Sequence, residues 1–557
     1  MKRFLTTDSL EKVFPDKGPK RQLKSYNMLK NEMFHFQACF YSKTLVWDCR
    51  IELESEISEF LSVRYVEPMP SHLYNRGGDR YVLKRKNGSS LYPELLRPVR
   101  HLGDFARPKL WTTWWITVNG QQNALPTGKH QIRINVYGKD KQGGEGKDIK
   151  IDSCIFELEV IDAALPKSDL RYTRWVHFDC ISHQHSKEIF SEKYYSVLNN
   201  YIKSAVSHGM TMLYTPLFTP ALDTRIGGER KTAQLVDITV NEKGDYLFSF
   251  DRLKRYMDNA KNLGIQYYEL SHIATQWGAY ACPKIIAKTP DGERKIFGWE
   301  TSSVSKEYID FLNLFLEKLK IFLDENEYSE YCYFHISDEP RPEHMERFKT
   351  LHSVVIKHFP NVKIMDALSH VEFFDSGVIN EPVCSTSCVK CFKGKRLKSV
   401  YYCCGMGVQH LSNTYFNLPS LRNRILGLQL YKNQMEGFLH WGFNFYNSAL
   451  SDRQLNPYFE TDGGGTFESG DSFVVYPYKD GVLESLRHEV FYDGLQDRCA
   501  IQLLERLTDK SFVEKFLKEL KIKGFTKYSR NEKKFLKFRK KLNEKIREKV
   551  QTEVCYE

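Results

Sequence analysis

The chain has 557 residues, of which 41% are hydrophobic, and a formal net charge of +11. A chain of this length exceeds what one simple core supports, so two or three domains are expected. No apolar run is long enough for a membrane span or a signal peptide, which predicts no membrane-spanning segment and a cytoplasmic location. The 13 cysteines are odd in number and several fall in predicted strands, which indicates buried free thiols rather than a disulfide framework.

Residues 1–165 read as short β-strands separated by turn residues. Strand-like segments cover residues 34–41, 111–118, 130–137 and 149–160. In the last segment the apolar alternation changes phase near Asp152, which predicts a β-bulge. Short strands at this spacing predict a β-sandwich domain. We interpret Trp111, Trp114 and Trp115 as core or interdomain packing in preference to a sugar-stacking surface.

Beyond residue 165 the pattern changes to strands that alternate with amphipathic helices, which is typical of a multidomain α/β protein. The eight candidate strands cover residues 173–180, 210–218, 265–273, 331–337, 362–369, 382–386, 399–404 and 437–444. The clearest helix covers residues 306–324, with Tyr308, Phe311 and Phe315 on one face. Eight strand–helix units predict a (β/α)8 TIM barrel over residues 166–480.

Residues 481–557 predict a helical, basic extension. A long helix is expected from residue 485 to about 507, and between Lys510 and Lys549 sixteen Lys and Arg stand against five Glu. A basic tail of this kind suits a nucleic acid or an anionic surface. Apolar residues close to helical spacing, among them Phe535 and Leu542, instead favour a helix with a solvated lysine face that packs on the barrel. We therefore predict no nucleic-acid partner.

Two adjacent carboxylates, Asp338 and Glu339, follow the fourth candidate strand and precede Pro340. The proline ends the strand because it has no N–H for the ladder. The pair is therefore expected at the carboxyl end of a core strand, where α/β folds place their chemistry. A helix cap is the competing interpretation, since acidic residues are common where helices begin. A glutamate there, flanked by aromatic residues, is suited to act as the general acid for a glycosidic bond.

Polar and aromatic side chains follow several other candidate strands, and their shared position at one face of a barrel favours a common site. The side chains considered are His177, Asp179, His272, Gln276, Trp277, Tyr402, Trp441, Asn444 and Tyr446. The predicted substrate-binding residues among them are Asp179, His272, Trp277, Tyr402, Trp441 and Asn444.

No metal or cofactor is predicted. Cys384, Cys388 and Cys391 lie close together, but no second pair of ligands follows at zinc spacing. The chain also lacks the glycine-rich dinucleotide and phosphate loops and the His-Glu-x-x-His zinc motif.

The nucleophile is the open question for a retaining glycosidase, which normally uses a second carboxylate about 5–5.5 Å from the acid. Strand seven, where that group is expected, ends in Cys403-Cys404-Gly405. The remaining partner for Glu339 is Asp338, and the backbone must bend if both are to face a substrate, because neighbours on a strand point to opposite sides. Two adjacent acids fit substrate-assisted hydrolysis, in which the 2-acetamido oxygen of the sugar attacks.

These motifs together resemble glycoside hydrolase family 123, the β-N-acetylgalactosaminidases. The resemblance covers most of the chain. The matching segments are His335 to Pro340, Ser271-His272 through Gln276-Trp277-Gly278, Tyr402-Cys403-Cys404, Asn413 with Arg424, Glu436 to Asn444, Gly470-Asp471 to Tyr476-Pro477, Ser485-Leu486-Arg487 and Asp493 to Asp497.

The resemblance implies a retaining, exo-acting enzyme that releases terminal β-linked GalNAc from glycans or glycolipids through an oxazoline-type intermediate. It implies that Asp338 stabilises the acetamido group and that Glu339 is the acid/base. A β-N-acetylglucosaminidase, which differs in the C4 hydroxyl of its substrate, is an alternative. A non-catalytic glycan-binding protein is another, although a binding module has no need of an acid/base pair.

Overall fold

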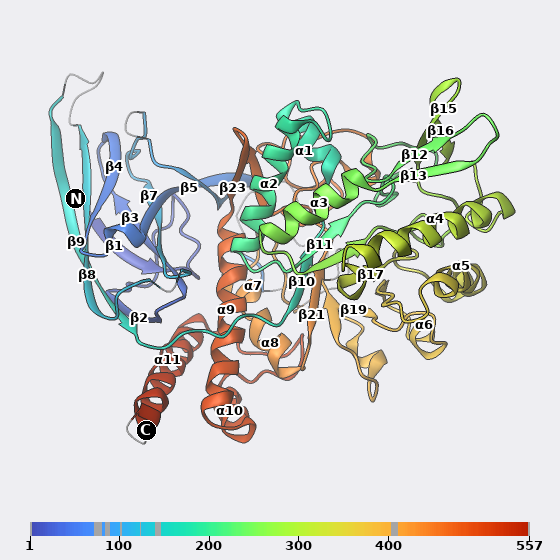
Figure 1. The fold of residues 1–557 in the computed structure, drawn as a ribbon. Helices are drawn as coiled ribbons and strands as arrows, with labels where there is room; N and C mark the ends of the chain where they lie inside the picture. The colour runs from blue at the N-terminus through green and yellow to red at the C-terminus, as the bar shows by residue number, and fades with distance from the viewer. Residues whose placement is uncertain are drawn as a thin grey trace.

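A computed structural model describes residues 3–71, 79, 81–83, 90–100, 103–122, 124–139, 146–402 and 410–554. The first part of the chain forms two sheets packed face to face (Figure 1). One sheet has the order β1 (Arg3–Asp8), β3 (Met33–Tyr41), β7 (Trp111–Asn119), β5 (Leu61–Ser71), β6 (Ser90–Pro98). The other has the order β2 (Ser25–Leu29), β9 (Asp148–Ile161), β8 (Gly128–Lys139), β4 (Trp47–Glu54).

The predicted bulge and the predicted tryptophan packing are both present in this sandwich. Asp152 pairs with Val136 and Lys150 with Tyr137, so one residue of β9 has no partner on β8. Trp114 packs in the core between the two sheets, whereas its neighbour Trp115 points the other way, into a cluster shared with the C-terminal helices. Successive side chains of a strand point to opposite faces, so Trp114 packs in the sandwich core and Trp115 packs between the sandwich and the C-terminal helices.

All eight candidate strands after residue 165 overlap a parallel strand, and most of these strands are shorter than expected. Five form a sheet in the order β10 (Arg171–Arg174), β21 (Gly437–His440), β20 (Ser399–Tyr401), β19 (Val383–Ser385), β18 (Ala367–Leu368). Three form a second sheet in the order β11 (Met212–Thr215), β14 (Tyr267–Leu270), β17 (Cys332–Phe334).

Two backbone contacts link the edges of these sheets. The Thr211 N–H donates to the Tyr172 carbonyl at 3.0 Å, which joins β10 to the start of β11. Phe334 of β17 forms a parallel bridge with Ile364, just before β18. Spatial neighbours therefore follow the order of the chain from β10 through β21.

The expected strand over residues 173–180 is wrong in its second half. Helix α1 (Phe178–His185) begins there, and its Phe178 and Ile181 side chains are buried. A short run of apolar residues fits either a buried helix or a buried strand, so the hydrophobic pattern alone does not distinguish the two.

Helices and two hairpins surround the parallel strands (Figure 1). The predicted helix over 306–324 is confirmed as α4, which begins after the cap Ser305. The helices along the chain are α2 (Glu192–Ser207), α3 (Asp251–Asn262), α4 (Lys306–Glu325), α5 (Met345–His358), α6 (Glu372–Asp375), α7 (Ser420–Arg424) and α8 (Leu426–Lys432). The sequence did not predict the sheet of β13 (Tyr246–Ser249), β12 (Asp237–Val240), β15 (Ile285–Thr289), β16 (Gly292–Phe297).

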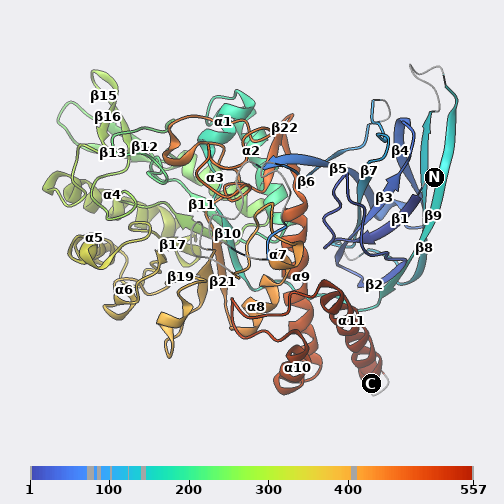
Figure 2. The ribbon, with the colours of Figure 1, turned by 180° about the vertical axis from the view of Figure 1, so that it is seen from behind.

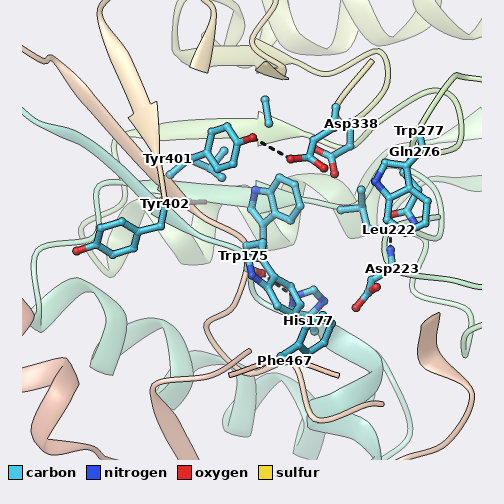
Figure 3. A pocket seen from close by; sticks show the side chains of 14 residues that line it. Trp175, His177, Leu222, Asp223, Gln276, Trp277, Asp338, Tyr401, Tyr402 and Phe467 are labelled. Carbon is cyan, nitrogen blue, oxygen red and sulfur yellow. Dashed lines mark hydrogen bonds between the residues drawn. The ribbon is translucent and has the colours of Figure 1, made fainter. Parts of the chain in front are cut away.

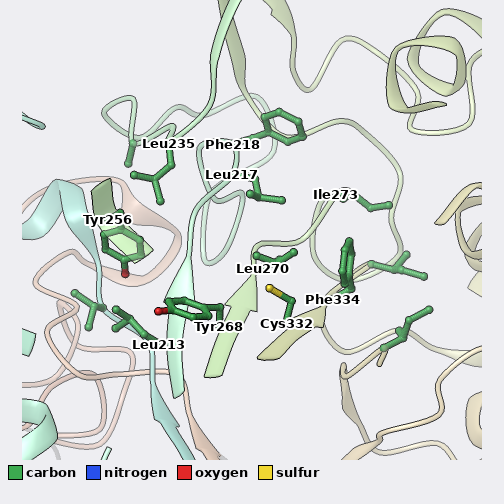
Figure 4. Packing of buried hydrophobic residues seen from close by; sticks show 14 of the residues in the cluster. Leu213, Leu217, Phe218, Leu235, Tyr256, Tyr268, Leu270, Ile273, Cys332 and Phe334 are labelled. Carbon is green, nitrogen blue, oxygen red and sulfur yellow. The ribbon is translucent and has the colours of Figure 1, made fainter. Parts of the chain in front are cut away.

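Apolar side chains from the parallel strands fill the space toward the helices. Figure 4 shows Leu213, Tyr268 and Leu270 side by side with Phe334, all in one buried cluster. The strand ends are therefore held on a packed support, which fixes the loops that follow them.

The C-terminal helix α9 (Leu486–Leu507) lies between the sandwich and the parallel strands (Figures 1 and 2). It follows the hairpin β22 (Val475–Tyr478) and β23 (Gly481–Glu484). Helices α8 and α9 touch at Gly427 and Gly494, where a Cβ on Gly427 would overlap the Gly494 carbonyl oxygen. Both glycines are therefore required by close backbone approach.

The basic tail forms α10 (Lys510–Leu517) and α11 (Glu532–Val554), and α11 packs on α9 and β2. Its Arg539 donates to Asp497 on α9 at 2.7 Å and also contacts Glu32 of the sandwich. Phe535 and Leu542 are buried, as their helical spacing predicted. Part of the positive charge of the tail thus holds the sandwich to α9. No helix in the described residues is long and apolar enough to cross a membrane.

Candidate active site

A pocket of about 690 Å³, including its solvent-open mouth, lies past the carboxyl ends of the parallel strands (Figure 3). The lining residues are Trp175, His177, Leu222, Asp223, Gln276, Trp277, Asp338, Glu339, Ala367, Tyr401, Tyr402, Leu439, Trp441 and Phe467. Three carboxylates and five Tyr or Trp side chains beside them give this pocket the character of a sugar site rather than of a purely apolar cavity.

The two adjacent acids both reach the pocket because the backbone bends between them. Glu339 has φ +46°, a left-handed conformation that is uncommon for a residue with a Cβ. The Tyr401 hydroxyl donates to Glu339 Oε1 at 2.8 Å. The next helical turn, a 3-10 helix, begins at Pro342 and has Arg341 as its N-cap, so Asp338 is not a helix cap.

The loop after β14 holds this bend in place. The Trp277 N–H donates to the Asp338 carbonyl at 2.9 Å, and the Ala274 N–H donates to the Ile336 carbonyl at 3.1 Å. The Ser337 hydroxyl donates to the Thr275 carbonyl at 2.8 Å. These bonds fix the backbone of the acidic pair from the neighbouring strand, which is the preorganisation that a catalytic group requires.

A buried charge cluster lies directly under the acidic pair. His335 contacts Asp366 through Nδ1 and Glu269 through Nε2, each at 2.7 Å. Asp366 also accepts the Ile336 N–H at 3.1 Å. Burial opposes a charge on His335, but the two carboxylates outweigh it and raise the pKa of His335 to about 10. His335 is therefore an imidazolium at neutral pH, with both ring nitrogens donating.

We expect the His335→Gln variant to lower the free energy of unfolding by roughly 3–5 kcal/mol, because two buried carboxylates lose their cation. The folded-state pKa of His335, about 10, lies above the unfolded value. The stabilisation is therefore complete below about pH 6.5 and is lost as the pH rises through 10. Urea unfolding midpoints at pH 7 and pH 10 should show the gap to wild type shrinking. His352→Gln, at a half-buried position of α5, is the control, and a gap that widens toward pH 10 would contradict the assignment.

His272 stacks on His335, with ring centroids 4.2 Å apart. Burial and the charge of His335 hold the pKa of His272 well below its usual range, so this ring is neutral. His272, His335 and Asp366 lie close enough to surround a metal ion. His335 nevertheless directs both nitrogens at carboxylates and has no lone pair to offer, so this donor set does not suit a metal.

Burial favours the neutral form of Asp338. It raises the pKa of Asp338 well above its usual range, and the negative charges of Glu339 and Asp366 add to the shift. A hydrogen-bond donor from a bound ligand would therefore be needed to hold Asp338 in its charged form.

Five of the predicted site residues line the pocket, namely Asp338, Glu339, Trp277, Tyr402 and Trp441. Asp179, His272 and Asn444 do not. Asp179 forms a bidentate ion pair with Arg230. Burial alone would raise the pKa of Asp179, but the guanidinium outweighs it and holds the pKa well below its usual range.

Asn444 has a positioning role in the loops around the pocket. Its Oδ1 accepts the His177 N–H at 2.8 Å, and its Nδ2 donates to the His177 carbonyl at 3.1 Å. It thus joins the loop after β10 to the loop after β21. Cys403 and Cys404, which were expected to end strand seven, lie outside the described residues.

Other pocket residues were not singled out from the sequence, chiefly Trp175, Asp223 and Phe467. Asp223 lies in the loop after β11, five residues past the expected strand, and a lone loop aspartate gives no signal of its own. Glu269, inside β14, did carry a signal, because a carboxylate in an apolar buried strand requires partners. It accepts from the indole of Trp175 at 2.6 Å.

Comparisons with known proteins show the family and the fold of the chain. The sequence model of the glycoside hydrolase 123 catalytic domain matches residues 175–504. No curated protein sequence matches the chain. The fold is similar to a family 123 glycoside hydrolase from Clostridium perfringens, studied for glycolipid glycan hydrolysis, with TM-score 0.72, 13% identity, and coverage of 99% of this chain and 98% of that chain. A putative β-galactosidase from Bacteroides fragilis gives TM-score 0.31 and 10% identity, over 84% of this chain and 59% of that chain.

Proposed function

The chain belongs to glycoside hydrolase family 123, and from this premise we propose that it is a retaining, exo-acting β-N-acetylgalactosaminidase. Its substrates are terminal β-linked GalNAc residues of glycans or glycolipids, the latter being the class hydrolysed by the Clostridium perfringens relative. The observation that carries the proposal is the acidic pair. Asp338 and Glu339 are adjacent in sequence, yet a left-handed Glu339 lets both line one pocket.

The proposal includes a fold in which the eight parallel strands act as one (β/α)8 barrel. The two edge links described above and the position of the pocket past the strand ends support it. We propose residues 1–165 as the sandwich domain, 166–480 as the catalytic barrel and 481–557 as the helical extension.

In the proposed reaction the 2-acetamido oxygen of the sugar attacks the anomeric carbon and Glu339 protonates the departing oxygen. Asp338 accepts a hydrogen bond from the acetamide N–H, which favours its charged form, while Glu339 carries the proton that the departing oxygen takes up. The attack closes a five-membered oxazoline-type ring whose positive charge Asp338 stabilises. Water activated by Glu339 then opens the ring, so the β configuration is retained.

The carboxylates lining the described pocket support a nucleophile from the substrate. Besides the acidic pair, Asp223 is the other carboxylate among these residues. Figure 3 shows the Asp223 carboxylate near His177, on another side of the pocket from Asp338. Asp223 is therefore poorly placed to form a retaining pair with Glu339, for which the carboxyls must lie close.

The remaining site residues hold the sugar or the pocket walls. Trp277, 47% exposed at the mouth, and Trp441 offer aromatic surface to a pyranose ring. Tyr402 packs edge-on against Phe438, and Figure 3 shows its hydroxyl directed away from Asp338. We propose that Asp179, His272 and Asn444 position the pocket walls without contacting the sugar. Asp179 does so through its ion pair with Arg230, His272 by stacking on His335, and Asn444 through its bonds to the loop after β10.

A panel of p-nitrophenyl glycosides tests this function. We expect kcat/KM for β-GalNAc to exceed that for β-GlcNAc by at least about tenfold, because a site built for one C4 hydroxyl leaves polar groups unpaired with its epimer. The α-linked GalNAc and the β-galactoside, which lacks the acetamido group, should be essentially inert. Faster turnover of β-GlcNAc would favour the glucosaminidase alternative, and binding of β-GalNAc without turnover would favour a glycan-binding protein.

A further inference from the structure

We propose that Asp223 and Gln276 form a two-sided contact that reads the C4 hydroxyl of the sugar. This inference rests on the proposed function and assigns its specificity to two side chains. Both residues line the pocket, from the loops after β11 and β14. Each presents one polar atom that has no partner in the described part of the chain, namely Asp223 Oδ2 and Gln276 Nε2.

A backbone hydrogen bond fixes which end of the Gln276 amide is free. The Asp223 N–H donates to Gln276 Oε1 (Figure 3), so the amide oxygen must face Asp223. The NH2 group then lies on the other side of the amide, and it is a donor only. The pair therefore leaves one unused acceptor and one unused donor in the same pocket.

The loop around Asp223 is held in an unusual backbone conformation. Asp223 has φ +46°. Its carbonyl accepts the Ser451 hydroxyl at 2.8 Å, and its Oδ1 accepts the Leu450 N–H at 3.4 Å. Contacts from a loop more than 200 residues away thus hold a left-handed aspartate, and such conformations cluster at functional sites.

No ion pair to Asp223 is formed in the described part of the chain. The charge of Arg230 acts on Asp223, but the guanidinium is committed to Asp179 in a bidentate pair. Burial raises the pKa of Asp223 to about 6, which reflects how little solvent the carboxylate retains. A buried acceptor of this kind requires a hydrogen-bond donor, and the described residues supply none to Oδ2.

A hydroxyl group matches both free atoms, because it donates one hydrogen bond and accepts others. It can donate to Asp223 Oδ2 while accepting from Gln276 Nε2. Asp338 and Glu339 locate the C1 and C2 side of the ring, and Figure 3 shows Asp223 on another side of the pocket from Asp338. C4 is opposite C1 in a pyranose, so the C4 hydroxyl is the group that meets the pair.

The experiment compares p-nitrophenyl β-GalNAc with its 4-deoxy and 6-deoxy analogues. For wild type, removal of the C4 hydroxyl should lower kcat/KM roughly 10- to 100-fold, as expected for a hydrogen bond to a charged group. Asp223→Ala should lose a similar factor on the parent sugar and less than about threefold on the 4-deoxy sugar. Gln276→Glu keeps the acceptor for the Asp223 N–H but removes the donor, and it should show the same pattern.

Matched controls separate recognition from folding. Asp452→Asn removes an exposed aspartate of the neighbouring loop, paired with Arg225, and should leave all three substrates unchanged. Asp223→Asn preserves shape, so its melting temperature reports whether the loop remains folded. Equal losses on the parent and 4-deoxy sugars, or sensitivity to the 6-deoxy sugar instead, would overturn this inference while leaving the proposed function intact. A wild-type protein that leaves β-GalNAc uncut would overturn both.

Discussion

Replacing Glu339 with glutamine is expected to lower kcat on a natural GalNAc-terminated disaccharide by roughly 10²- to 10⁴-fold, the usual contribution of a general acid. The dinitrophenolate of a 2,4-dinitrophenyl glycoside departs without protonation, so the variant should turn over that substrate within about tenfold of the wild-type rate. The Tyr401 hydroxyl, which donates to Glu339 Oε1, also accepts, so it can remain bonded to the new amide. The measurement is kcat/KM on both substrates.

The control for Glu339→Gln is Glu343→Gln. Glu343 is an exposed acid four residues along, in the 3-10 helix after the bend, and its variant should match wild type. If Glu339→Gln lowered kcat/KM equally for both substrates, Glu339 would not be the general acid.

Replacing Asp338 with asparagine is expected to lower kcat roughly 10²- to 10³-fold while changing KM little. The positive charge of the oxazoline-type ring exists only as the reaction proceeds, so its loss of stabilisation appears in turnover rather than in binding. Steady-state kinetics on p-nitrophenyl β-GalNAc give both parameters.

An inhibitor tests the same step from the side of the substrate. A thiazoline analogue of GalNAc mimics the cyclised sugar and should compete with substrate on wild type, and it should bind more weakly to Asp338→Asn. A covalent sugar adduct trapped on any side chain, or efficient cleavage of β-galactosides, would show that a protein carboxylate is the nucleophile.

Local patterns in the sequence determined several of the elements and the place of the acidic pair. The apolar face of residues 306–324 predicted α4, the phase change near Asp152 predicted the bulge of β9, and the spacing around Phe535 predicted a packed tail. A buried strand that runs into Asp338 and Glu339 already placed both acids at a strand end. Each of these depends on residues a few positions apart, which is why periodicity was sufficient.

Only the tertiary structure decided which strand-end side chains face the pocket. Past the last ladder bond the alternation of a strand no longer fixes direction, and left-handed residues such as Glu339, Trp277 and Asp223 turn the chain. Hydrogen-bond and ion-pair partners from distant loops then determine which polar groups stay free to meet a ligand. Arg230 withdraws Asp179 into an ion pair, whereas Gln276 leaves Asp223 with a free oxygen. Those pairings join segments about 50 residues apart, so no local pattern in the sequence contains them.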